Sequence, residues 1–592
     1  MHAGAQALIR ADVDENGDPS ESEEKANTST TTAAPTAAGS TTSTVSSHPV
    51  PGGEKAGEGV EHVDFINGLA LLIHQLPDRL REAFFTSLDN FMPDLDVDFE
   101  DDEAEAMYLA ASSLAPNGDL DAVQVIRGEE EIDVGALKAE FEAASPFPHA
   151  SIPDFVPIPE VYAAVKAEVG SRLEFEPKSN DLYDFVQSKE LKTLDTAAGF
   201  LWLPKLRDAI YDPAFLQIMT SVTGIEIDPA TIDMHALAFE RGDYLGLHDD
   251  NVPGRRIAFI LYLVEPEWDA ASHGGALELY GSEPNSNKPT PEVLKTLAPS
   301  PNTFTFFSVS ATSYHAVAEV THPSATRLSV SGWLHGAHLT PKLPRVMEPL
   351  IFAASSPLPP STPLASLISA KYLNSGTLAA IADEFAEVSC VSLPNFLRPD
   401  VARAVLDASF PSCVTDAVVT LPPDEGNYVC TSSPHGGGAG GVDVQAALAS
   451  SEFHALLKSL TGLDDLGSGT SPLFRSFFAG MHQLLLDRTA HSGASGVLDV
   501  YLDLSTLPEL ELPERTTLEG EPIDRISPGS VVYMSETEVI LSLPPAFNTL
   551  HLVYRSAEVE GDGKTLTFVK HVTCHAGMRN GRHDLNCMFK AS

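Results

Sequence analysis

Three hydrophobic patterns follow one another along the chain. Residues 27–47 are almost wholly Thr, Ser, Ala, Pro and Gly, a composition that buries too little apolar surface to offset chain entropy. From Phe65 to Phe91 apolar residues recur at helical spacing, and an acidic run from Asp94 to Glu103 follows. Short strand-like runs dominate from Phe147 onward. We therefore predict a disordered tail, a helical appendage and a β-rich body.

The middle of the chain predicts one helix and then a series of short strands. The helix should begin at Pro159, because proline suits the first helical position and apolar residues follow at helical spacing. Gly, Pro and Asn turns separate the strand-like runs, a pattern typical of a jelly roll or barrel. The runs are 256–263, 276–280, 303–309 and 327–334.

The last third of the chain resembles the middle. The sequence SIPDFV at 151–156 is similar to SLPNFL at 392–397, and each precedes a proline that opens a predicted helix. FLQIMTSVTG at 215–224 is similar to FHALLKSLTG at 453–462. Ser300-Pro301 and Ser527-Pro528, each before a strand-like run, form a third match. The order is kept, so we infer two copies of one fold.

Charge and targeting signals restrict the partners and the compartment. Lys and Arg number 36 against 83 Asp and Glu, a net charge of -47, which disfavours binding to nucleic acid or an anionic membrane and suits a basic partner. The acidic run after residue 93 is either a solvated segment or a docking surface for such a partner. Five scattered cysteines and the lack of a signal peptide or membrane span indicate the cytoplasm or nucleus.

A set of candidate metal ligands lies in the first copy. His248 and Asp250 form an H-x-D motif, and His315 follows a later strand-like run. Two histidines and one carboxylate on one face of Fe(II) leave three coordination positions open, which is the arrangement of non-haem oxygenases. The motif alone is weak, because His62 and Asp64 form a second one.

A buried arginine supplies the second half of the candidate site. Arg327 shares one strand face with Ser329, Ser331 and Trp333, and this face should point into the barrel. A buried guanidinium needs an anion, so Arg327 should bind the distal carboxylate of 2-oxoglutarate, with Ser329 and Tyr262 within reach. Each residue alone has a structural alternative: a turn for His248, a strand end for His315, a surplus acid for Arg327 and core packing for Tyr262. Only their joint occurrence favours the oxygenase.

These residues carry a family resemblance. The segments that resemble the eukaryotic prolyl hydroxylases of a small-subunit ribosomal protein are 248–250, 254–263, 274–280, His315 and 327–336. The resemblance covers the chain from about Phe147 to its C-terminus.

The resemblance implies a mainly β fold with flanking helices. It implies two tandem double-stranded β-helix (jelly-roll) domains, with a metal site in the first only. Matching Tyr501 to Tyr262 puts Asp487 and Thr489 in place of His248 and Asp250, which also predicts a second copy without the site. The domains predicted are a tail (1–59), an appendage (60–143), a catalytic domain (144–343), a linker (344–388) and a non-catalytic domain (389–592).

For function, the resemblance implies Fe(II) ligands at His248, Asp250 and His315 and 2-oxoglutarate contacts at Tyr262 and Arg327. It implies O2 as cosubstrate, L-ascorbate to keep the iron reduced, and hydroxylation of a proline in a basic ribosomal protein near the decoding centre, with effects on termination and decoding accuracy. The alternatives are an oxygenase acting on another protein or on nucleic acid, and an inert translation-associated scaffold. The ring carbon attacked, the number of hydroxyl groups and the oligomeric state stay open.

Overall fold

The predicted helix at Pro159 and the four predicted strands are present. The structure is a computed structural model, and the predicted tail, the helix expected over 65–91 and the His62 motif lie outside the residues that it describes. The helix is α5 (Pro159–Arg172), and the strands are β6 (Arg255–Tyr262), β7 (Leu277–Ser282), β9 (Phe304–Ser308) and β11 (Arg327–His335). The described residues are 123–194, 199–284, 288–337, 362–409 and most of 419–591.

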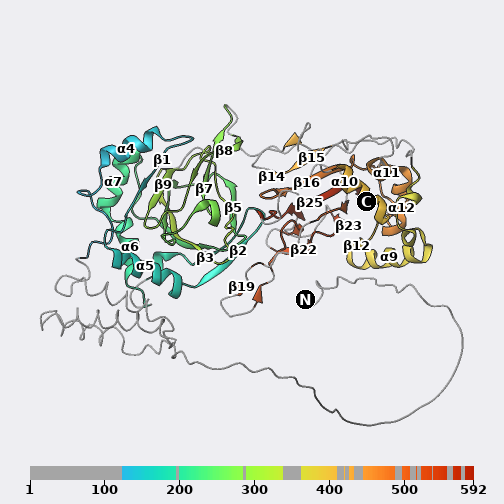
Figure 1. Ribbon diagram of the computed structural model, residues 1–592, viewed down its shortest axis with the longest axis horizontal. Coiled ribbons are helices and arrows are strands. Elements are labelled where there is room, and N and C mark those ends of the chain that lie inside the picture. Colours follow the sequence, from blue (N-terminus) through green and yellow to red (C-terminus); the bar gives the residue numbers. More distant parts are fainter. Residues whose placement is uncertain are drawn as a thin grey trace, which may run out of the picture. The chain divides into compact units, whose positions relative to one another are not determined.

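The first region is built on one antiparallel sheet of 11 strands. Neighbouring strands follow the order β1-β9-β6-β11-β4-β3-β5-β10-β7-β8, and β2 pairs with β3. In Figure 1 the sheet curls on itself as in a double-stranded β-helix, with helices on its outside. The further elements are α4 (Val134–Ala143), β1 (His149–Ile152), β2 (Phe175–Ser179), β3 (Tyr183–Ser188), η3 (Leu191–Thr193), α6 (Trp202–Ile210), α7 (Pro213–Thr223), β4 (Ile232–Phe239), β5 (Tyr244–His248), α8 (Ala270–His273), β8 (Pro289–Leu297) and β10 (His315–Val317).

The two faces of this sheet bury different clusters. The outer face, which includes Leu328 and Val330 of β11, packs against helices α4 to α7 in the largest apolar core. Helix α4 lies upstream of the boundary predicted at residue 144, and its Phe141 stacks on Phe306 of β9 with ring centroids 5.5 Å apart. The inner face holds two smaller clusters around Tyr262 and Phe307. Because side chains alternate along a strand, Arg327 lies on the inner face, as predicted.

The second region contains a seven-stranded and a five-stranded sheet. Their orders are β12-β23-β18-β25-β16-β15-β13 and β14-β17-β24-β21-β22. The elements are η5 (Leu364–Ser366), η6 (Ala370–Leu373), α9 (Ser375–Val388), β12 (Cys390–Pro394), α10 (Pro399–Ser409), β13 (Val419–Thr420), β14 (Gly426–Asn427), β15 (Val429–Thr431), α11 (Val444–Leu448), α12 (Ser451–Thr461), β16 (Leu473–Phe477), β17 (His482–Leu486), β18 (Gly496–Asp503), β19 (Arg515–Thr516), β20 (Pro522–Ile523), β21 (Val531–Met534), β22 (Val539–Leu543), β23 (Thr549–Ser556), β24 (Leu566–Val569) and β25 (Arg582–Ala591).

Strand pairing shows that the second region repeats the first. The path β1-β9-β6-β11-β4 has its counterpart in β12-β23-β18-β25-β16, and β5-β10-β7-β8 in β17-β24-β21-β22. Asn302 and Asn548 occupy the same place before β9 and β23, both with positive φ (52° and 56°). Each side chain forms two hydrogen bonds to one backbone residue, Val156 or Leu397, in the SIPDFV and SLPNFL segments. The inferred duplication is therefore present in the fold.

One of the three sequence matches behind that inference is wrong. Ser300-Pro301 precedes β9, whereas Ser527-Pro528 precedes β21, the counterpart of β7. The two Ser-Pro pairs therefore open strands at different places in the fold. A serine and a proline before a strand are too common a pattern to identify equivalent positions.

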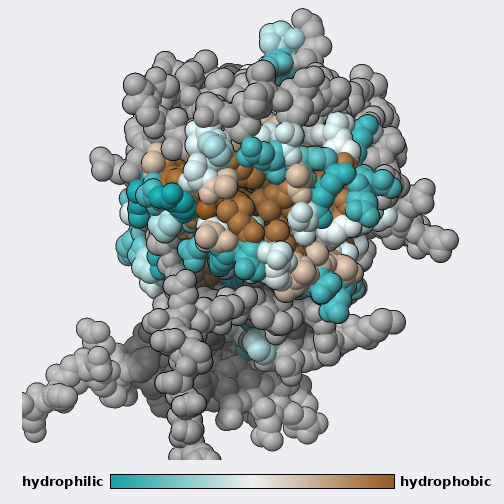
Figure 2. All heavy atoms as spheres, turned by 90° about the vertical axis from the view of Figure 1, so that its right-hand side faces the viewer, coloured by the Kyte–Doolittle hydropathy of each residue, from teal (hydrophilic) through white to brown (hydrophobic). Residues whose placement is uncertain are grey.

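The second region has an apolar patch on one face of its surface. One face of the second region, seen in Figure 2, gathers apolar side chains at its middle and hydrophilic ones around them. Leu373 and Val388, just before α9 and at its last residue, are 45% and 56% exposed. Among the described residues, no helix is long and apolar enough to cross a membrane.

Candidate metal centre

Two adjacent strands bring the predicted histidines together. His248 at the end of β5 pairs directly with His315 at the start of β10, and their ring centroids are 4.1 Å apart. Each ring fixes its orientation through Nδ1, which lies 2.8 Å from the carbonyl oxygen of Gly246 for His248 and of Ser313 for His315. Donation from Nδ1 leaves Nε2 as the ligand atom, and such bonds commonly orient metal-binding histidines.

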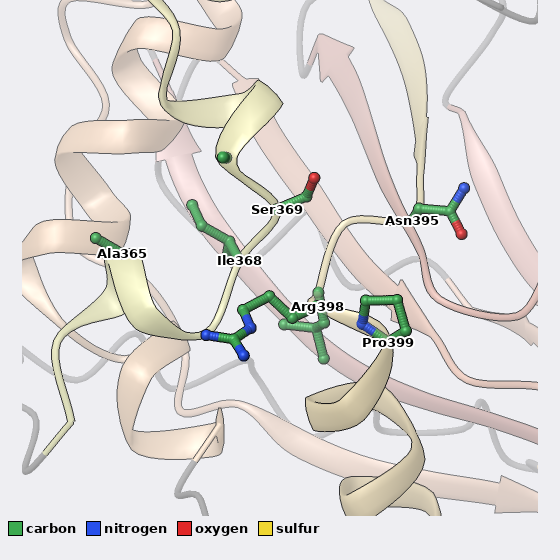
Figure 3. A pocket seen from close by; sticks show the side chains of 8 residues that line it. Ala365, Ile368, Ser369, Asn395, Arg398 and Pro399 are labelled. Atoms are coloured by element: carbon green, nitrogen blue, oxygen red, sulfur yellow. The ribbon is translucent and has the colours of Figure 1, made fainter. Parts of the chain in front are cut away.

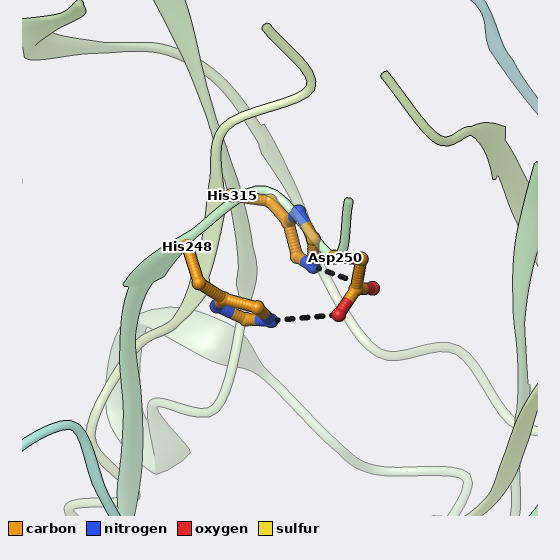
Figure 4. Close-up of side chains that lie close together, drawn as sticks. All are labelled: His248, Asp250 and His315. Atoms are coloured by element: carbon orange, nitrogen blue, oxygen red, sulfur yellow. Dashed lines mark ion pairs between the residues drawn. The ribbon is translucent and has the colours of Figure 1, made fainter. Parts of the chain in front are cut away.

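Asp250 completes the cluster from the turn after β5. Its backbone has a φ of 57°, which short polar residues tolerate, and its carboxylate faces both histidines (Figure 4). One carboxylate oxygen lies 3.4 Å from His248 Nε2, and the other lies 3.3 Å from His315 Nε2. The three ligand atoms all lie within 4.8 Å of one another, so one ion can contact all of them.

Burial and mutual attraction set the charges of this cluster. Burial raises the pKa of Asp250, but the two facing histidines outweigh it and hold the pKa well below its usual range. Burial lowers the pKa of His248, but the charge of Asp250 outweighs it and raises the pKa. The geometry therefore favours an ionised carboxylate, the form in which Asp250 can bind a cation.

A series of contacts that leads outward from Asp250 through Trp333 and Arg255 to Asp233 was not predicted from the sequence. Trp333 Nε1 donates a hydrogen bond of 3.0 Å to Asp250 Oδ2. The guanidinium of Arg255 lies 3.3 Å from the centre of a Trp333 ring and donates from Nε to Asp233 Oδ2 over 3.1 Å. In the sequence, Trp333 could be placed on the same strand face as Arg327. That position alone did not indicate a contact with Asp250.

Arg327 lies deeper in the same barrel and is 1% exposed. Its Nε donates to the carbonyl oxygen of Gly275 over 2.7 Å, and the guanidinium lies about 5 Å from the rings of Phe239 and Tyr262. Burial lowers the pKa of Arg327, and Tyr262 opposes this shift. Ser329 faces Tyr262 across the β11-β6 pairing. The structure thus brings the three predicted carboxylate-binding residues together.

This arrangement fits an anionic ligand. Apart from the interaction between their own two side chains, neither Arg327 Nη2 nor the buried Tyr262 hydroxyl has a hydrogen-bond partner among the described residues. No carboxylate in the described part of the chain forms an ion pair with Arg327, although a buried guanidinium is costly without an anion. The residues present therefore suit a carboxylate beside Arg327 and a divalent metal at the His-Asp-His cluster.

Strand register shows what the second region has at these positions. Val317↔Leu245 and His315↔His248 pair in the first region, and Val569↔Gln483 and Thr567↔Leu486 pair in the second with the same register shift. Leu486 and Thr567 therefore stand where His248 and His315 stand in the first. Neither histidine of the cluster therefore has a histidine counterpart in the described part of the second region.

The predicted match of Tyr501 to Tyr262 is off by two residues, and the match of Asp487 to His248 is off by one. Ser329 pairs with Tyr262 in the first region, and Asp584 pairs with Asp503 in the second. Asp503 is the counterpart of Tyr262. The β17-β24 pairing independently makes Leu486, rather than Asp487, the counterpart of His248. The error arose because a tyrosine follows an apolar run in both strands, and hydrogen-bond register alone distinguishes the two alignments.

A separate hollow lies in the second region, beside the start of α10 (Figure 3). Its one charged lining residue, Arg398, donates to Asp400 over 3.1 Å. The hollow offers no histidine, cysteine or carboxylate to a metal, because its lining residues are Ala365, Ile368, Ser369, Ala370, Asn395, Leu397, Arg398 and Pro399.

Comparisons with known proteins agree with this geometry. Residues 234–335, which include the His-Asp-His cluster and Arg327, match the model of the 2OG-Fe(II) oxygenase superfamily. The first barrel therefore defines an oxygenase that uses Fe(II) and 2-oxoglutarate as its cofactors.

Curated relatives give the particular family. A Xenopus laevis protein named prolyl 3-hydroxylase OGFOD1 is 31% identical over 74% of this chain and 85% of its own. The Mus musculus protein of that name is 38% identical over 44% of this chain and 46% of its own. An Ostreococcus tauri prolyl 3,4-dihydroxylase OGFOD1 is 28% identical over 75% of this chain and 95% of its own. The chain belongs to the OGFOD1-type family of prolyl hydroxylases.

Proposed function

We propose that His248, Asp250 and His315 bind Fe(II), and that Arg327 binds the distal carboxylate of 2-oxoglutarate with help from Tyr262 and Ser329. The observation that supports this most directly is that one barrel contains both a compact His-Asp-His cluster and a buried guanidinium without a carboxylate partner among the described residues. Fe(II) with 2-oxoglutarate and O2 supplies the oxidising chemistry that hydroxylates a C–H bond. L-ascorbate would keep the iron reduced.

The protein's own residues hold and orient these groups. Arg327 would fix one end of 2-oxoglutarate through its planar set of donors, so that the other end reaches the metal. The inner-face cluster that contains Phe307 and Leu279 lines the barrel beside His315, and the Phe307 ring lies 4.6 Å from the His315 ring. These apolar side chains would exclude water from the reacting groups.

The substrate that we propose is a prolyl residue of a basic small-subunit ribosomal protein. The names of the relatives support a prolyl substrate. The net charge of -47 supports a basic one, because opposite charge steers encounter. Such a modification would influence termination and decoding accuracy, and it would take place in the cytoplasm or nucleus. The same charge disfavours direct binding to nucleic acid.

The two halves of the chain would then divide the work. Residues 144–343 would be the catalytic domain, and residues 389–592 a non-catalytic domain. Of the predicted linker 344–388, the part that forms η5, η6 and α9 packs into the core of that second domain. The register match of Leu486 and Thr567 to the two histidines supports this division.

Mass spectrometry of a peptide from the ribosomal protein tests the proposal. Incubation with the full chain, Fe(II), 2-oxoglutarate and O2 should add the mass of one oxygen or more at a proline. His315→Ala should abolish the gain, whereas His322→Ala should retain it, because His322 stacks on His273 and not on the metal cluster. A gain that persists in His315→Ala, or that needs no 2-oxoglutarate, would refute the assignment.

A further inference from the structure

The second barrel keeps the arginine of the first. Arg327 pairs with Phe239 across β11 and β4, and Arg582 pairs with Phe477 across β25 and β16. Each guanidinium also donates to a glycine carbonyl two residues before the corresponding strand, Gly275 at 2.7 Å and Gly529 at 2.9 Å. The two glycines have nearly the same positive φ, 71° and 73°. The frame that places the guanidinium has therefore been retained, although the metal ligands have not.

What differs is the partner of the arginine. Asp503 and Asp584 stand at the positions of Tyr262 and Ser329. Arg582 Nη1 lies 3.2 Å from Asp503 Oδ2, and Arg582 Nε lies 3.1 Å from Asp584 Oδ2. All three side chains are fully buried. Arg327 has no such carboxylate among the described residues. The buried arginine is therefore paired with carboxylates of the chain in the second barrel and not in the first.

A second arginine balances the additional acid. Arg475 stands at the position of Leu237. Its Nε and Nη2 donate hydrogen bonds of 2.8 Å to the two carboxylate oxygens of Asp584. Two arginines and two aspartates therefore form one buried network. Burial raises the pKa of Asp503, and Arg582 opposes this shift. Burial raises the pKa of Asp584, but Arg475 and Arg582 outweigh it and hold the pKa below its usual range.

We propose that Asp503 and Asp584 are a built-in substitute for the cosubstrate carboxylate, so that the second barrel contains a masked carboxylate-binding site. The inference rests on the proposed role of Arg327, since that role defines the position being filled. In the second barrel, the two aspartates would thus contact the buried arginine as 2-oxoglutarate would contact Arg327 in the first barrel. Removing an aspartate and its volume would expose a site for small carboxylates, because Arg582 Nη2 has no hydrogen-bond partner in the described part of the chain and shares an edge with Nε.

Chemical rescue tests this proposal on the full chain. Asp584→Ser removes the carboxylate and leaves space, as Ser329 does in the first barrel, whereas the matched control Asp584→Asn removes the charge and leaves no space. Both variants should lower Tm, on the order of 10 °C, because each strands buried guanidinium groups. Acetate at constant ionic strength should restore Tm in Asp584→Ser and not in Asp584→Asn. Where Asp584→Ser does not fold, Asp503→Ser, which releases Arg582 alone, takes its place.

The affected barrel can be identified by its spectroscopic signal. All three tryptophans (Trp202, Trp268 and Trp333) belong to the first region, so their fluorescence follows that barrel, whereas circular dichroism follows both. Loss and rescue should appear in the dichroism transition, and the fluorescence transition should move less. It should still move to some extent, because buried ion pairs such as that of Arg515 with Asp184 join the two barrels. Equal rescue of Asp584→Ser and Asp584→Asn, or rescue of Asp584→Ser by chloride as well as by acetate, would overturn the proposal.

Stoichiometry separates this inference from the proposed function. Calorimetric titration of the wild-type chain should show one 2-oxoglutarate site, and Arg327→Gln should show none. A site that survives Arg327→Gln in the otherwise wild-type chain would mean that the second barrel is open, which contradicts the masked site. If instead 2-oxoglutarate did not bind the wild-type chain at all, the proposed function would fail, while acetate rescue of Asp584→Ser would still establish the masked site.

Discussion

The indole nitrogen of Trp333 donates a hydrogen bond of 3.0 Å to the carboxylate of Asp250, although the two residues lie on different elements of the barrel. Oδ2, which accepts this bond, is also the oxygen nearest to His315 Nε2, at 3.3 Å. The indole therefore limits the rotation of the one carboxylate in the metal cluster, and it occupies the outer layer of contacts that commonly tunes metal affinity.

Trp333→Phe tests this contact. The phenyl ring still packs under Arg255 but cannot donate, so we expect the dissociation constant for Fe(II) to rise on the order of 10-fold. Anaerobic titration against a competing chelator measures it. Trp268→Phe is the matched control, because Trp268 Nε1 donates to the Gly274 carbonyl at 3.2 Å and not to the cluster. Equal affinities in wild type and Trp333→Phe would show that the bond does not position Asp250.

Arg327→Gln should affect 2-oxoglutarate and spare the metal. Losing the charge-assisted pair should raise KM for 2-oxoglutarate roughly 100-fold, while the dissociation constant for Fe(II) stays within about twofold. Tyr262→Phe should give a smaller rise, because it removes one neutral hydrogen bond. Steady-state kinetics at varied 2-oxoglutarate measures both variants. A Tyr262→Phe effect as large as that of Arg327→Gln would contradict this division of roles.

Asp233 should make the first barrel sensitive to acid. Burial raises the pKa of Asp233, but bonds from His235 and His335 and the charge of Arg255 outweigh it, so the pKa falls to about 2. A lowered pKa contributes stability that is complete above the ordinary value of ~3.9 and is lost as the pH falls toward 2. Asp233→Asn should therefore be less stable than wild type at pH 7, and the difference should shrink in acid. Denaturant unfolding followed by tryptophan fluorescence measures this difference, and a constant difference down to pH 3 would exclude Asp233 as the cause.

The duplicated asparagines provide a matched pair of stability variants. Asn302→Ala and Asn548→Ala each remove two hydrogen bonds to one backbone residue and place alanine at a positive φ, so each should cost ~2–4 kcal/mol. Asn302→Ala should shift the tryptophan fluorescence transition, whereas Asn548→Ala should shift the circular dichroism transition more than the fluorescence transition. If both variants shifted the fluorescence transition equally, the two barrels would unfold as one unit.

Local patterns in the sequence were sufficient for much of the fold and of the candidate site. The alternation of Arg327, Ser329, Ser331 and Trp333 predicted a strand with its arginine inward, and β11 shows it. The H-x-D motif with a distant histidine predicted a cluster that strand pairing brings together. Both predictions use information that short segments carry, because period-two alternation and ligand type are local properties.

The remainder depended on register and tertiary contact. The hydrogen bond from Trp333 to Asp250 joins residues 83 positions apart, and a local sequence pattern contains no sign of such a contact. The equivalence of Asp503 with Tyr262 follows from hydrogen-bond pairing, whereas residue similarity had pointed to Tyr501. The stacking of Phe141 on Phe306 joins segments far apart in the chain, and a local pattern contains no sign of such a contact.

The pairing of His248 with His315 also has a consequence for engineering. Two metal ligands from distant parts of the chain are positioned by a single antiparallel register, so the length of the intervening loops is free to vary provided that β5 and β10 stay aligned. The β8 strand, which lies between them along the chain, is exposed at six of its nine residues. New peptide-binding loops could therefore be grafted at the end of the β7-β8 hairpin, and the selectivity of the enzyme redesigned without rebuilding its metal centre.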